Sequence, residues 1–309
     1  MKYEVGMSVK SISNPLTLEA VDAIGRSGLK TLETNPCNFA CSEPEKVLEA
    51  FVEMTEKAGK RTPTYHCPYG TDWDLSSVDE AMRKAAMERL VGLFPQAHRL
   101  SAGILVEHPS WEPVAEEERP ARIASLRKSL EELSPVLKKE GFRMAMEDLP
   151  RTCLGHTAEE LMAILEGLDD TFGVCFDVNH LNGRSAGIPD AVRLFGKRLY
   201  CLHISDYYGG DECHLVPGDG VIDWRAFNAA LCEIGYEGDY NYEVRIPDKT
   251  AGERCACVVK NFNEFMSPFF KWGQGEHLPS GGAEVRAPSA GASGIRALRE
   301  SVFILSIGI

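Results

Sequence analysis

Residues 172–206 read FGVCFDVNHLNGRSAGIPDAVRLFGKRLYCLHISD, and this stretch contains the pattern that decides the fold. Two apolar segments, Phe172–His180 and Leu199–Asp206, have the composition of buried strands, and a helical stretch separates them. Each segment carries an ionisable residue toward its carboxyl end, because Asp177 follows GVCF and His203 follows LYCL. The stretch therefore predicts a strand–helix–strand unit whose strands end in polar groups.

The same alternation of a short apolar segment and a helical stretch continues along the chain on both sides of this unit. The segments predicted as strands are Tyr3–Val9, Leu29–Thr34, Thr62–Tyr69, Arg99–His108, Arg143–Leu149, Phe172–His180, Leu199–Asp206 and Asp239–Val244. The residues expected to cap helices are Gly28, Gly59, Gly141 and Gly235 at carboxyl ends and Asp223 at an amino end. Eight consecutive units of this kind predict an α/β fold, the (β/α)8 TIM barrel. A doubly wound sheet would normally carry a glycine-rich turn after its first strand, where this sequence has SVKSISNPLT, so the barrel is favoured.

The composition of the chain changes after residue 272. Residues 1–272 are predicted to form the barrel, which a last helix near Gly252–Trp272 should close. Residues 273–309 are rich in Gly, Ala, Ser and Pro, and we expect them to form a flexible C-terminal extension without a part in the site. The final segment, SVFILSIGI, is too short to span a membrane but could dock on the barrel or on a partner.

The overall composition is that of a globular protein and excludes several partners. The apolar fraction is 44% and the charged fraction is 26%. The 33 basic and 46 acidic residues give a net charge of −13, so we expect no nucleic-acid partner. Ten cysteines without a CxxC pair, and an N-terminus without an apolar signal core, predict reduced thiols in a cytoplasmic protein with no membrane partner. Assembly into a homo-oligomer stays open.

Four consecutive predicted strands end in an ionisable residue, namely Glu147, Asp177, His203 and Glu243. Because side chains alternate along a strand, three of them share a face with the small residues Ala145, Cys175 and Cys201. Three carboxylates and one imidazole converging at the mouth of a barrel would repel one another, and a divalent cation would relieve that repulsion. The alternative for each residue is a local strand cap or ion pair.

Further candidates for the mouth come from histidines, aromatic residues and two charged residues. His66, His108 and His180 also lie at predicted strand ends, and His214 lies in the loop after the seventh strand. Loop aromatics that could cover a sugar, or simply pack within their loops, are Tyr69, Trp73, Trp111 and Tyr207. Glu33 could accept a sugar hydroxyl or pair with a cation, and Arg245 could meet a substrate oxygen or neutralise the carboxylates. The predicted substrate-binding residues are His180, His66, His108, His214, Glu33, Arg245 and Trp111.

An ordered set of short motifs resembles the xylose isomerase-like TIM barrels. These motifs are TYHCPYGTDWDLSS, LVEHP, MEDLP, CFDVNH, LHISD, HLVPGDGVIDW and NYEV, and the resemblance covers roughly residues 3–270. It implies metal ligands at Glu147, Asp177, His203 and Glu243 and a pocket histidine at His180. It also implies that Glu147 and Glu243 transfer the proton, on opposite faces of a sugar.

The endonuclease IV branch of the same superfamily also resembles this sequence. That branch holds three zinc ions with additional histidines, and the corresponding positions here are His66, His108, His180 and His214. Glu212 stands where the branch has Asp. A duplex-binding nuclease should surround its mouth with Lys and Arg, whereas the predicted loops GTDWDLSS, WEPVAEEERP and YYGGDEC are acidic or neutral.

The expected chemistry is proton transfer next to a carbonyl, helped by one divalent cation. Carboxylate and imidazole ligands favour Mn²⁺ as the first expectation, with Mg²⁺, Co²⁺ or Zn²⁺ as alternatives. Such an ion would stabilise an enediolate, so the prediction is an isomerase or epimerase acting on an unphosphorylated sugar or cyclitol. The alternatives are a zinc phosphodiesterase, a keto-cyclitol dehydratase and a sugar-binding barrel without turnover.

Overall fold

The computed structural model describes residues 3–181 and 183–274. The predicted C-terminal extension, 273–309, lies outside the described residues except for its first two. The boundary placed after residue 272 falls inside the final 3₁₀ segment, Ser267–Gln274.

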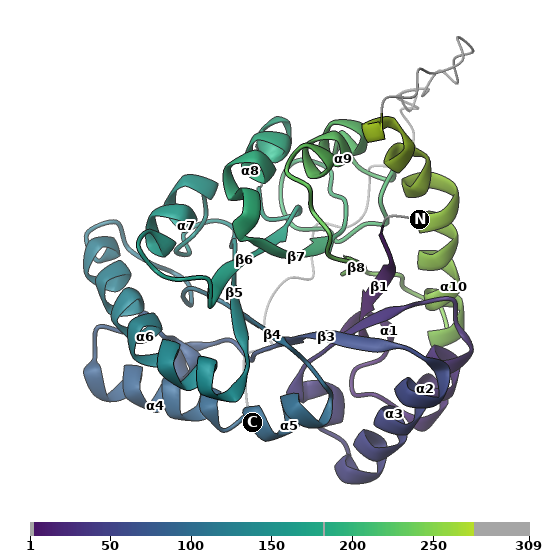
Figure 1. The fold of residues 1–309 in the computed structure, drawn as a ribbon, viewed down its shortest axis with the longest axis horizontal. Coiled ribbons are helices and arrows are strands. Elements are labelled where there is room, and N and C mark those ends of the chain that lie inside the picture. The colour runs from purple at the N-terminus through teal and green to yellow at the C-terminus, as the bar shows by residue number, and fades with distance from the viewer. Residues whose placement is uncertain (1–2, 182, 275–309) are drawn as a thin grey trace, which may run out of the picture. The chain divides into compact units, whose positions relative to one another are not determined.

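Eight parallel strands form one closed barrel in chain order, which confirms the predicted fold (Figure 1). The strands are β1 (Val5–Ser8), β2 (Thr31–Thr34), β3 (Arg61–His66), β4 (Ile104–Glu107), β5 (Arg143–Glu147), β6 (Phe172–Asp177), β7 (Leu199–Ile204) and β8 (Tyr240–Tyr242). Each strand falls within the segment predicted for it, except that β3 begins one residue earlier.

Helices surround the barrel and connect successive strands (Figure 1). The α-helices are α1 (Val9–Ile12), α2 (Leu18–Arg26), α3 (Pro44–Ala58), α4 (Glu80–Val91), α5 (Phe94–Arg99), α6 (Arg119–Glu140), α7 (Ala158–Leu165), α8 (Ile188–Phe195), α9 (Trp224–Glu233) and α10 (Ala251–Asn261). Shorter helical turns are η1 (Pro36–Phe39), η2 (Thr71–Trp73), η3 (Ser185–Gly187), η4 (Gly196–Arg198), η5 (Phe262–Met266) and η6 (Ser267–Gln274).

The predicted helix caps are confirmed with one exception. Gly59, Gly141 and Gly235 adopt left-handed backbone conformations, and the Asp223 side chain accepts a hydrogen bond from the Ala226 amide. Gly28 is not a cap, because α2 ends at Arg26 and Ser27 is extended. At Gly28 a Cβ atom would lie 3.0 Å from a methyl carbon of Val259 on α10, so close helix packing explains this glycine.

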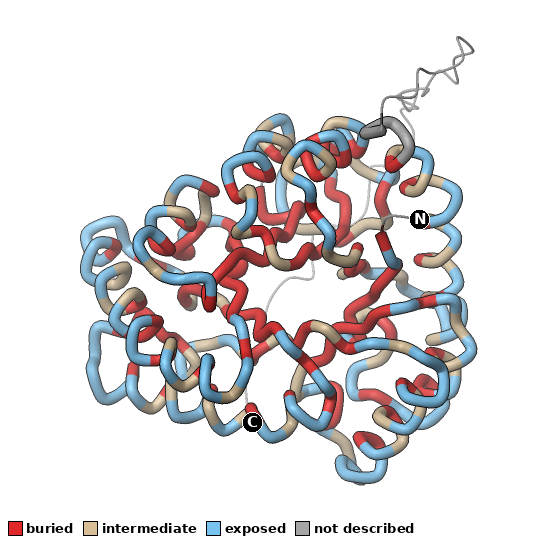
Figure 2. The backbone as a smooth tube through the Cα atoms, in the orientation of Figure 1, coloured by how far each residue is buried: buried red, intermediate tan, exposed pale blue. Residues whose placement is uncertain are grey.

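The apolar core has two parts, and the smaller one fills the barrel interior. The large part lies between the strands and the surrounding helices, and Figure 2 shows the buried strands at the centre. The small part consists of Ile104, Val106, Ala145, Cys175 and Cys201. Small interior side chains therefore lie beneath the carboxyl ends of β5, β6 and β7, as the alternation of the sequence predicted.

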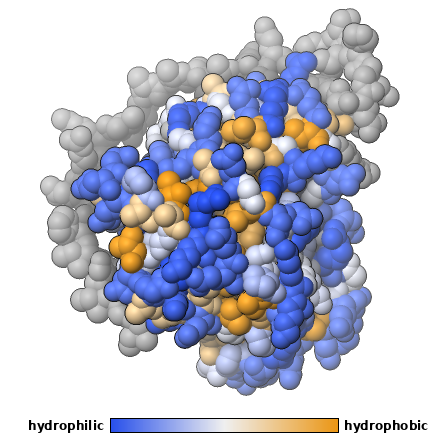
Figure 3. Space-filling view, turned by 60° about the vertical axis from the view of Figure 1, so that its left-hand side comes forward, coloured by the Kyte–Doolittle hydropathy of each residue, from blue (hydrophilic) through white to orange (hydrophobic). Residues whose placement is uncertain are grey.

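The outer surface and the cysteines give no sign of a membrane segment or a disulfide in the part described. Figure 3 shows mainly hydrophilic residues on one side of the barrel, with apolar residues in separate spots. No helix among the described residues combines the length and the apolar character that crossing a membrane requires. All ten cysteines are free thiols.

Candidate metal centre and active site

The carboxyl ends of β5 to β8 bring together the four residues predicted as metal ligands. Glu147, Asp177, His203 and Glu243 each offer one donor atom, and these atoms lie within 4.8 Å of one another. The Nδ1 atom of His203 lies 2.9 Å from Glu147 Oε1 and 3.1 Å from Glu243 Oε2. Strand register explains the convergence, because Asp177 pairs with His203 across β6 and β7, and the Glu243 amide donates to Ile204 at the end of β7.

The burial of this group leaves one carboxylate oxygen, Asp177 Oδ2, without a hydrogen bond, although His180 Nε2 lies 3.6 Å from it. Asp177 and His203 are fully buried, and the Oδ2 atom of Asp177 has no hydrogen-bond partner among the described residues. Burial raises the pKa of Asp177. An acceptor that is buried without a donor costs free energy unless a proton or a cation occupies it. The donor set therefore fits a divalent cation, which accepts oxygen and imidazole ligands together.

The two glutamates of the group differ in how firmly they are held. Burial would raise the pKa of Glu147, but His203, His108 and His66 hold it well below the usual range. Burial likewise opposes ionisation of Glu243, and His203 and His214 lower its pKa. The Glu147 side chain is 2% exposed whereas that of Glu243 is 19% exposed. Glu243 is therefore ionised but more accessible than Glu147.

Glu33 is buried beside His203 and is not among the residues that line the mouth cavity, so its expected contact with a substrate stays a prediction. The Nε2 atom of His203 lies 3.1 Å from Glu33 Oε2, on the side opposite the Nδ1 atom. Burial lowers the pKa of His203, but Glu33, Glu147 and Glu243 raise it well above its usual value. A carboxylate behind a ligating imidazole fixes the ring orientation and the tautomer.

Two further histidines hold the second oxygen of Glu147. The Nε2 atoms of His66 and His108 lie 3.1 Å and 3.0 Å from Glu147 Oε2, while His203 contacts Oε1. Burial lowers the pKa of His66, but Glu147 raises it to about 9. Burial lowers the pKa of His108 below its usual value. Three imidazoles on one carboxylate therefore fix the position of Glu147, and His66, His108 and Glu147 form a second set of donors.

His180 and His214 face the mouth from the other side of the group. Each Nδ1 atom lies against a backbone carbonyl oxygen, at 2.6 Å from Asp148 for His180 and at 3.0 Å from Glu243 for His214. Their Nε2 atoms lie 3.9 Å and 3.8 Å from Glu212 Oε2. Because each Nδ1–H donates to a carbonyl, each Nε2 is directed toward the mouth.

A cavity of about 940 Å³, the mouth cavity, opens above these residues. One wall is aromatic, since the Tyr69 ring stacks on His108 at 4.7 Å and on Trp111 at 5.8 Å. Tyr207 is buried and its hydroxyl donates to the Leu181 carbonyl, so it packs within its loop. Trp73 does not line the cavity either. Of the four loop aromatics, Tyr69 and Trp111 are therefore placed to meet a ligand.

Lys10 is a mouth residue that the sequence reasoning missed. It lies on α1 directly after β1, lines the mouth cavity and donates to the Tyr69 hydroxyl at 3.2 Å. Burial lowers its pKa, but Tyr69, Glu243 and Glu147 raise it overall, so the ammonium stays charged. Arg245 is exposed and lines the same cavity. The position of Lys10 after a strand end was the available signal.

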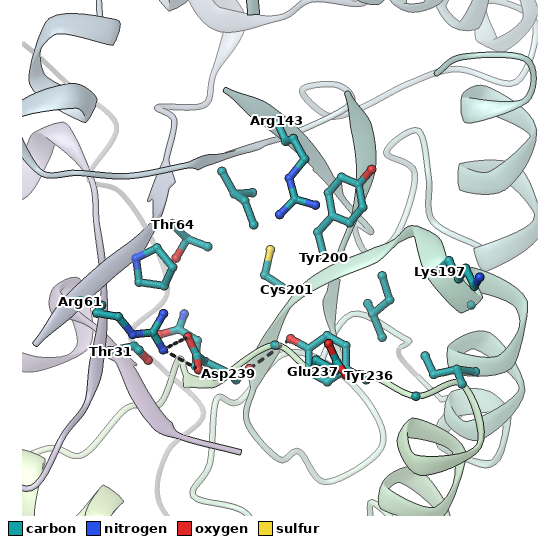
Figure 4. A pocket seen from close by; sticks show the side chains of 18 of the residues that line it. Thr31, Arg61, Thr64, Arg143, Lys197, Tyr200, Cys201, Tyr236, Glu237 and Asp239 are labelled. Atoms are coloured by element: carbon teal, nitrogen blue, oxygen red, sulfur yellow. Dashed lines mark hydrogen bonds and ion pairs between the residues drawn. The ribbon is translucent and has the colours of Figure 1, made fainter. Parts of the chain in front are cut away.

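A second cavity of about 640 Å³, the lower cavity, lies at the opposite end of the barrel (Figure 4). Arg61 pairs there with Glu4 and Asp239, and the Arg143 guanidinium lies 4.5 Å from the centre of the Tyr200 ring. None of its lining residues is a histidine or a member of the two donor sets. The groups suited to metal binding and proton transfer therefore belong to the mouth cavity, the end at which TIM-barrel enzymes work.

Comparisons with known proteins identify several similar chains. The chain is 25% identical over 228 residues to a D-psicose 3-epimerase of Enterocloster bolteae, covering 71% of this chain and 73% of that enzyme. It is 24% identical over 210 residues to an inosose isomerase of Bacillus licheniformis, covering 64% and 74%. A match to an uncharacterized protein of Methanocaldococcus jannaschii is 29% identical over 184 residues, 58% of this chain, and spans only 62% of that protein.

A solved structure and a protein family also match this chain. The IOLI protein with a binding zinc atom superposes with a TM-score of 0.72 at 20% identity, covering 86% of this chain and 99% of that one. Residues 20–260 match the family described as xylose isomerase-like TIM barrel, which is most of the barrel. The chain therefore belongs to the xylose isomerase-like TIM barrel family.

Proposed function

We propose that this protein is a divalent-metal-dependent isomerase or epimerase of a sugar or cyclitol. The observation that carries the proposal is the convergence of four donor atoms, with one unpartnered buried oxygen on Asp177, at the base of the mouth cavity. The epimerases and isomerases among its relatives support the same class of reaction at low identity.

Glu147, Asp177, His203 and Glu243 would hold the cation. When bound, it would polarise a ketose carbonyl with its neighbouring hydroxyl and so acidify the hydrogen on the carbon between them. Mn²⁺ remains our first expectation, with Mg²⁺, Co²⁺ or Zn²⁺ as alternatives, and the zinc atom of the IOLI structure supports a divalent ion.

Glu243 and Glu147 would share the proton transfer. Glu243 is ionised and partly accessible, so it is suited to take the proton. Glu147 contacts the same Nδ1 atom of His203 and is fixed in place by three imidazoles. Return of the proton to the opposite face would give an epimer, and return to the neighbouring carbon would give an isomer. His180, whose Nε2 faces the mouth, would bind a substrate hydroxyl, and the Tyr69–Trp111 wall would cover the apolar face of the sugar.

A zinc phosphodiesterase is the second candidate, and a specific arrangement favours it. His66 and His108 share Glu147 Oε2 and form a second donor set, and His180 and His214 both approach Glu212. Against it, the rim beside Arg151 is acidic, since Glu112, Asp211 and Glu212 all pair with that one arginine. A keto-cyclitol dehydratase would begin with the same proton abstraction, and a sugar-binding barrel would bind without turnover.

Metal analysis together with a substrate panel tests the proposal. We expect one tightly bound divalent ion per chain and exchange of the substrate α-proton with deuterium oxide for at least one ketose or inosose in the presence of Mn²⁺. Three zinc ions per chain with cleavage of an abasic-site duplex would establish the phosphodiesterase instead. No metal and no exchange, with retained sugar binding, would establish the binding protein. Loss of water from an inosose would identify the dehydratase.

Cytoplasmic location and homo-oligomer formation remain predictions for fractionation and sedimentation measurements.

A further inference from the structure

One wall of the mouth cavity is basic, although the protein as a whole is strongly acidic. Three cations line this wall: Lys10 on α1, Arg245 after β8 and Arg254 on α10. Among the described residues, none of the three has a carboxylate oxygen within 4.0 Å, the limit for an ion pair. Three positive charges on one wall of a cavity stand out in a chain of net charge −13.

Arg151, on the opposite wall of the same cavity, is a cation that carboxylates surround. Arg151 lies 2.7 Å from Glu112, 3.3 Å from Asp211 and 2.5 Å from Glu212. Its charge is therefore more than balanced before any ligand arrives. No carboxylate makes a comparable ion pair with the basic wall, although Glu243 and Glu147 act on the Lys10 ammonium from farther away, so the wall can still bind an anionic group.

Arg254 holds the basic wall together. Its Nη1 donates to the Ile12 carbonyl at 2.9 Å, and its Nε donates to the Ile246 carbonyl at 3.0 Å. Ile12 lies two residues after Lys10, and Ile246 directly follows Arg245. One guanidinium thus ties the segment that carries Lys10 to the segment that carries Arg245.

A short chain of side-chain contacts connects the basic wall to the proposed metal site. Lys10 donates to the Tyr69 hydroxyl, and the Tyr69 ring stacks on His108. His108 in turn contacts Glu147, one of the four donors. A single aromatic ring therefore separates the ammonium from the histidines that hold Glu147.

We infer that the substrate carries an anionic group, a carboxylate or a phosphate, that Lys10, Arg245 and Arg254 bind while its carbonyl end lies at Glu147, Asp177, His203 and Glu243. This inference rests on the proposed function and narrows its substrate class to acidic sugars. Guanidinium groups match the planar oxygens of carboxylate and phosphate, and an ammonium adds a point charge. Basic residues on one wall alone, opposite an acidic rim, suit a small anion better than a nucleic-acid backbone.

Binding of unreactive polyols to the Mn²⁺-loaded full chain tests the inference independently of turnover. The probes are glucitol, gluconate and glucitol 6-phosphate, which lack a ketone and differ in charge. We expect calorimetry to show at least about tenfold tighter binding of one anionic polyol than of glucitol, with an advantage that declines as salt increases. Tighter gluconate identifies a carboxylate and tighter glucitol 6-phosphate a phosphate. Equal affinity for all three would overturn the inference.

Substitutions then locate the preference. Lys10→Met and Arg245→Gln should each remove most of the anionic advantage, measured as the ratio of the affinities for the anionic polyol and for glucitol in the same variant. Lys197→Met is the matched control, because Lys197 is an exposed cation that lines the lower cavity (Figure 4). Arg254 is left intact because it binds two backbone carbonyls. An anionic preference that survives both Lys10→Met and Arg245→Gln would contradict the assignment.

Turnover separates failure of this inference from failure of the proposed function. If matched neutral and acidic ketoses exchange their α-protons equally well, the function stands and the anionic subsite is wrong. If no ketose reacts but the polyol preference and its loss in the variants hold, the subsite stands and the function is wrong. If an abasic-site duplex displaces the anionic polyol and is cleaved, the basic wall belongs to a nuclease and the inference is overturned.

Discussion

The two cavities at opposite ends of this barrel differ in the kind of polar groups that line them and in how those groups are arranged. In the lower cavity, the two arginines are paired or stacked: Arg61 contacts Glu4 and Asp239, and Arg143 lies over Tyr200. In the mouth cavity, carboxylates crowd around imidazoles and leave a buried Asp177 oxygen without a hydrogen bond. The mouth cavity is therefore distinguished by a group of converging metal-ligand atoms, one of which lacks a hydrogen bond, and not only by its larger volume.

The comparison would break most clearly if Glu243 proved dispensable. Glu243→Gln keeps a ligating oxygen but removes the base, so we expect α-proton exchange to fall by about 10²-fold or more while metal affinity falls modestly. Proton NMR in deuterium oxide measures the exchange. Asp239→Asn, in the lower cavity, is the matched control and should leave exchange unchanged. Equal effects of the two substitutions would remove the distinction between the cavities.

A second test concerns the carboxylate behind His203. Glu33→Gln should weaken metal binding by about 10- to 100-fold, because the amide supports the His203 ring less strongly than a carboxylate. Competition with a metal chelator measures the affinity. An unchanged affinity would mean that His203 does not need Glu33 to present its Nδ1 atom.

His180 tests whether the mouth binds substrate with its imidazoles. His180→Ala should weaken binding of the sugar by about 1–3 kcal/mol, because a buried hydrogen-bond partner is lost, and should leave the metal content unchanged. Calorimetry with the active sugar and elemental analysis give the two readouts. A loss of metal without a loss of sugar affinity would assign His180 to a cation.

The pH dependence of stability offers a smaller effect, measured in the metal-free protein. The pKa of His66 is raised to about 9 in the folded state, so its contribution to the free energy of unfolding is fully present below its unfolded pKa of about 6.5. That contribution is lost as the pH rises through about 9. We expect the stability difference between wild type and His66→Asn to shrink between pH 6.5 and pH 9.5 in urea titrations. A difference that grows would have the wrong sign.

The smallest effect is expected in the lower cavity. Arg61→Met removes ion pairs that are open to solvent, so the free energy of unfolding should fall by less than about 1 kcal/mol and α-proton exchange should stay unchanged. Denaturant titration and the NMR assay check both. A large loss of activity would show that the two ends of the barrel are coupled.

The barrel and the four converging donors could be predicted because both follow from strand periodicity. Glu147, Asp177 and His203 each end a segment whose alternation fixes the inward face. Pairing with a cation was one of two roles expected for Glu33, but its partner His203 could not be predicted, since spacing does not determine which imidazole nitrogen of His203 points inward. Lys10 was missed because a lysine on a short helical turn has the same local sequence pattern whether it faces solvent or a cavity.

The origin of the four donors in four separate strands has a consequence for how the chain folds. Glu147, Asp177, His203 and Glu243 come from the last four strand–helix units, so a bound cation would join segments that are distant in sequence. An ion that binds only the assembled donors stabilises the native state against unfolding by mass action. Contacts of such long range also form late and slow the folding of a barrel. The cation would therefore stabilise the assembled second half of the barrel, and it would be released before β5 and β8 separate.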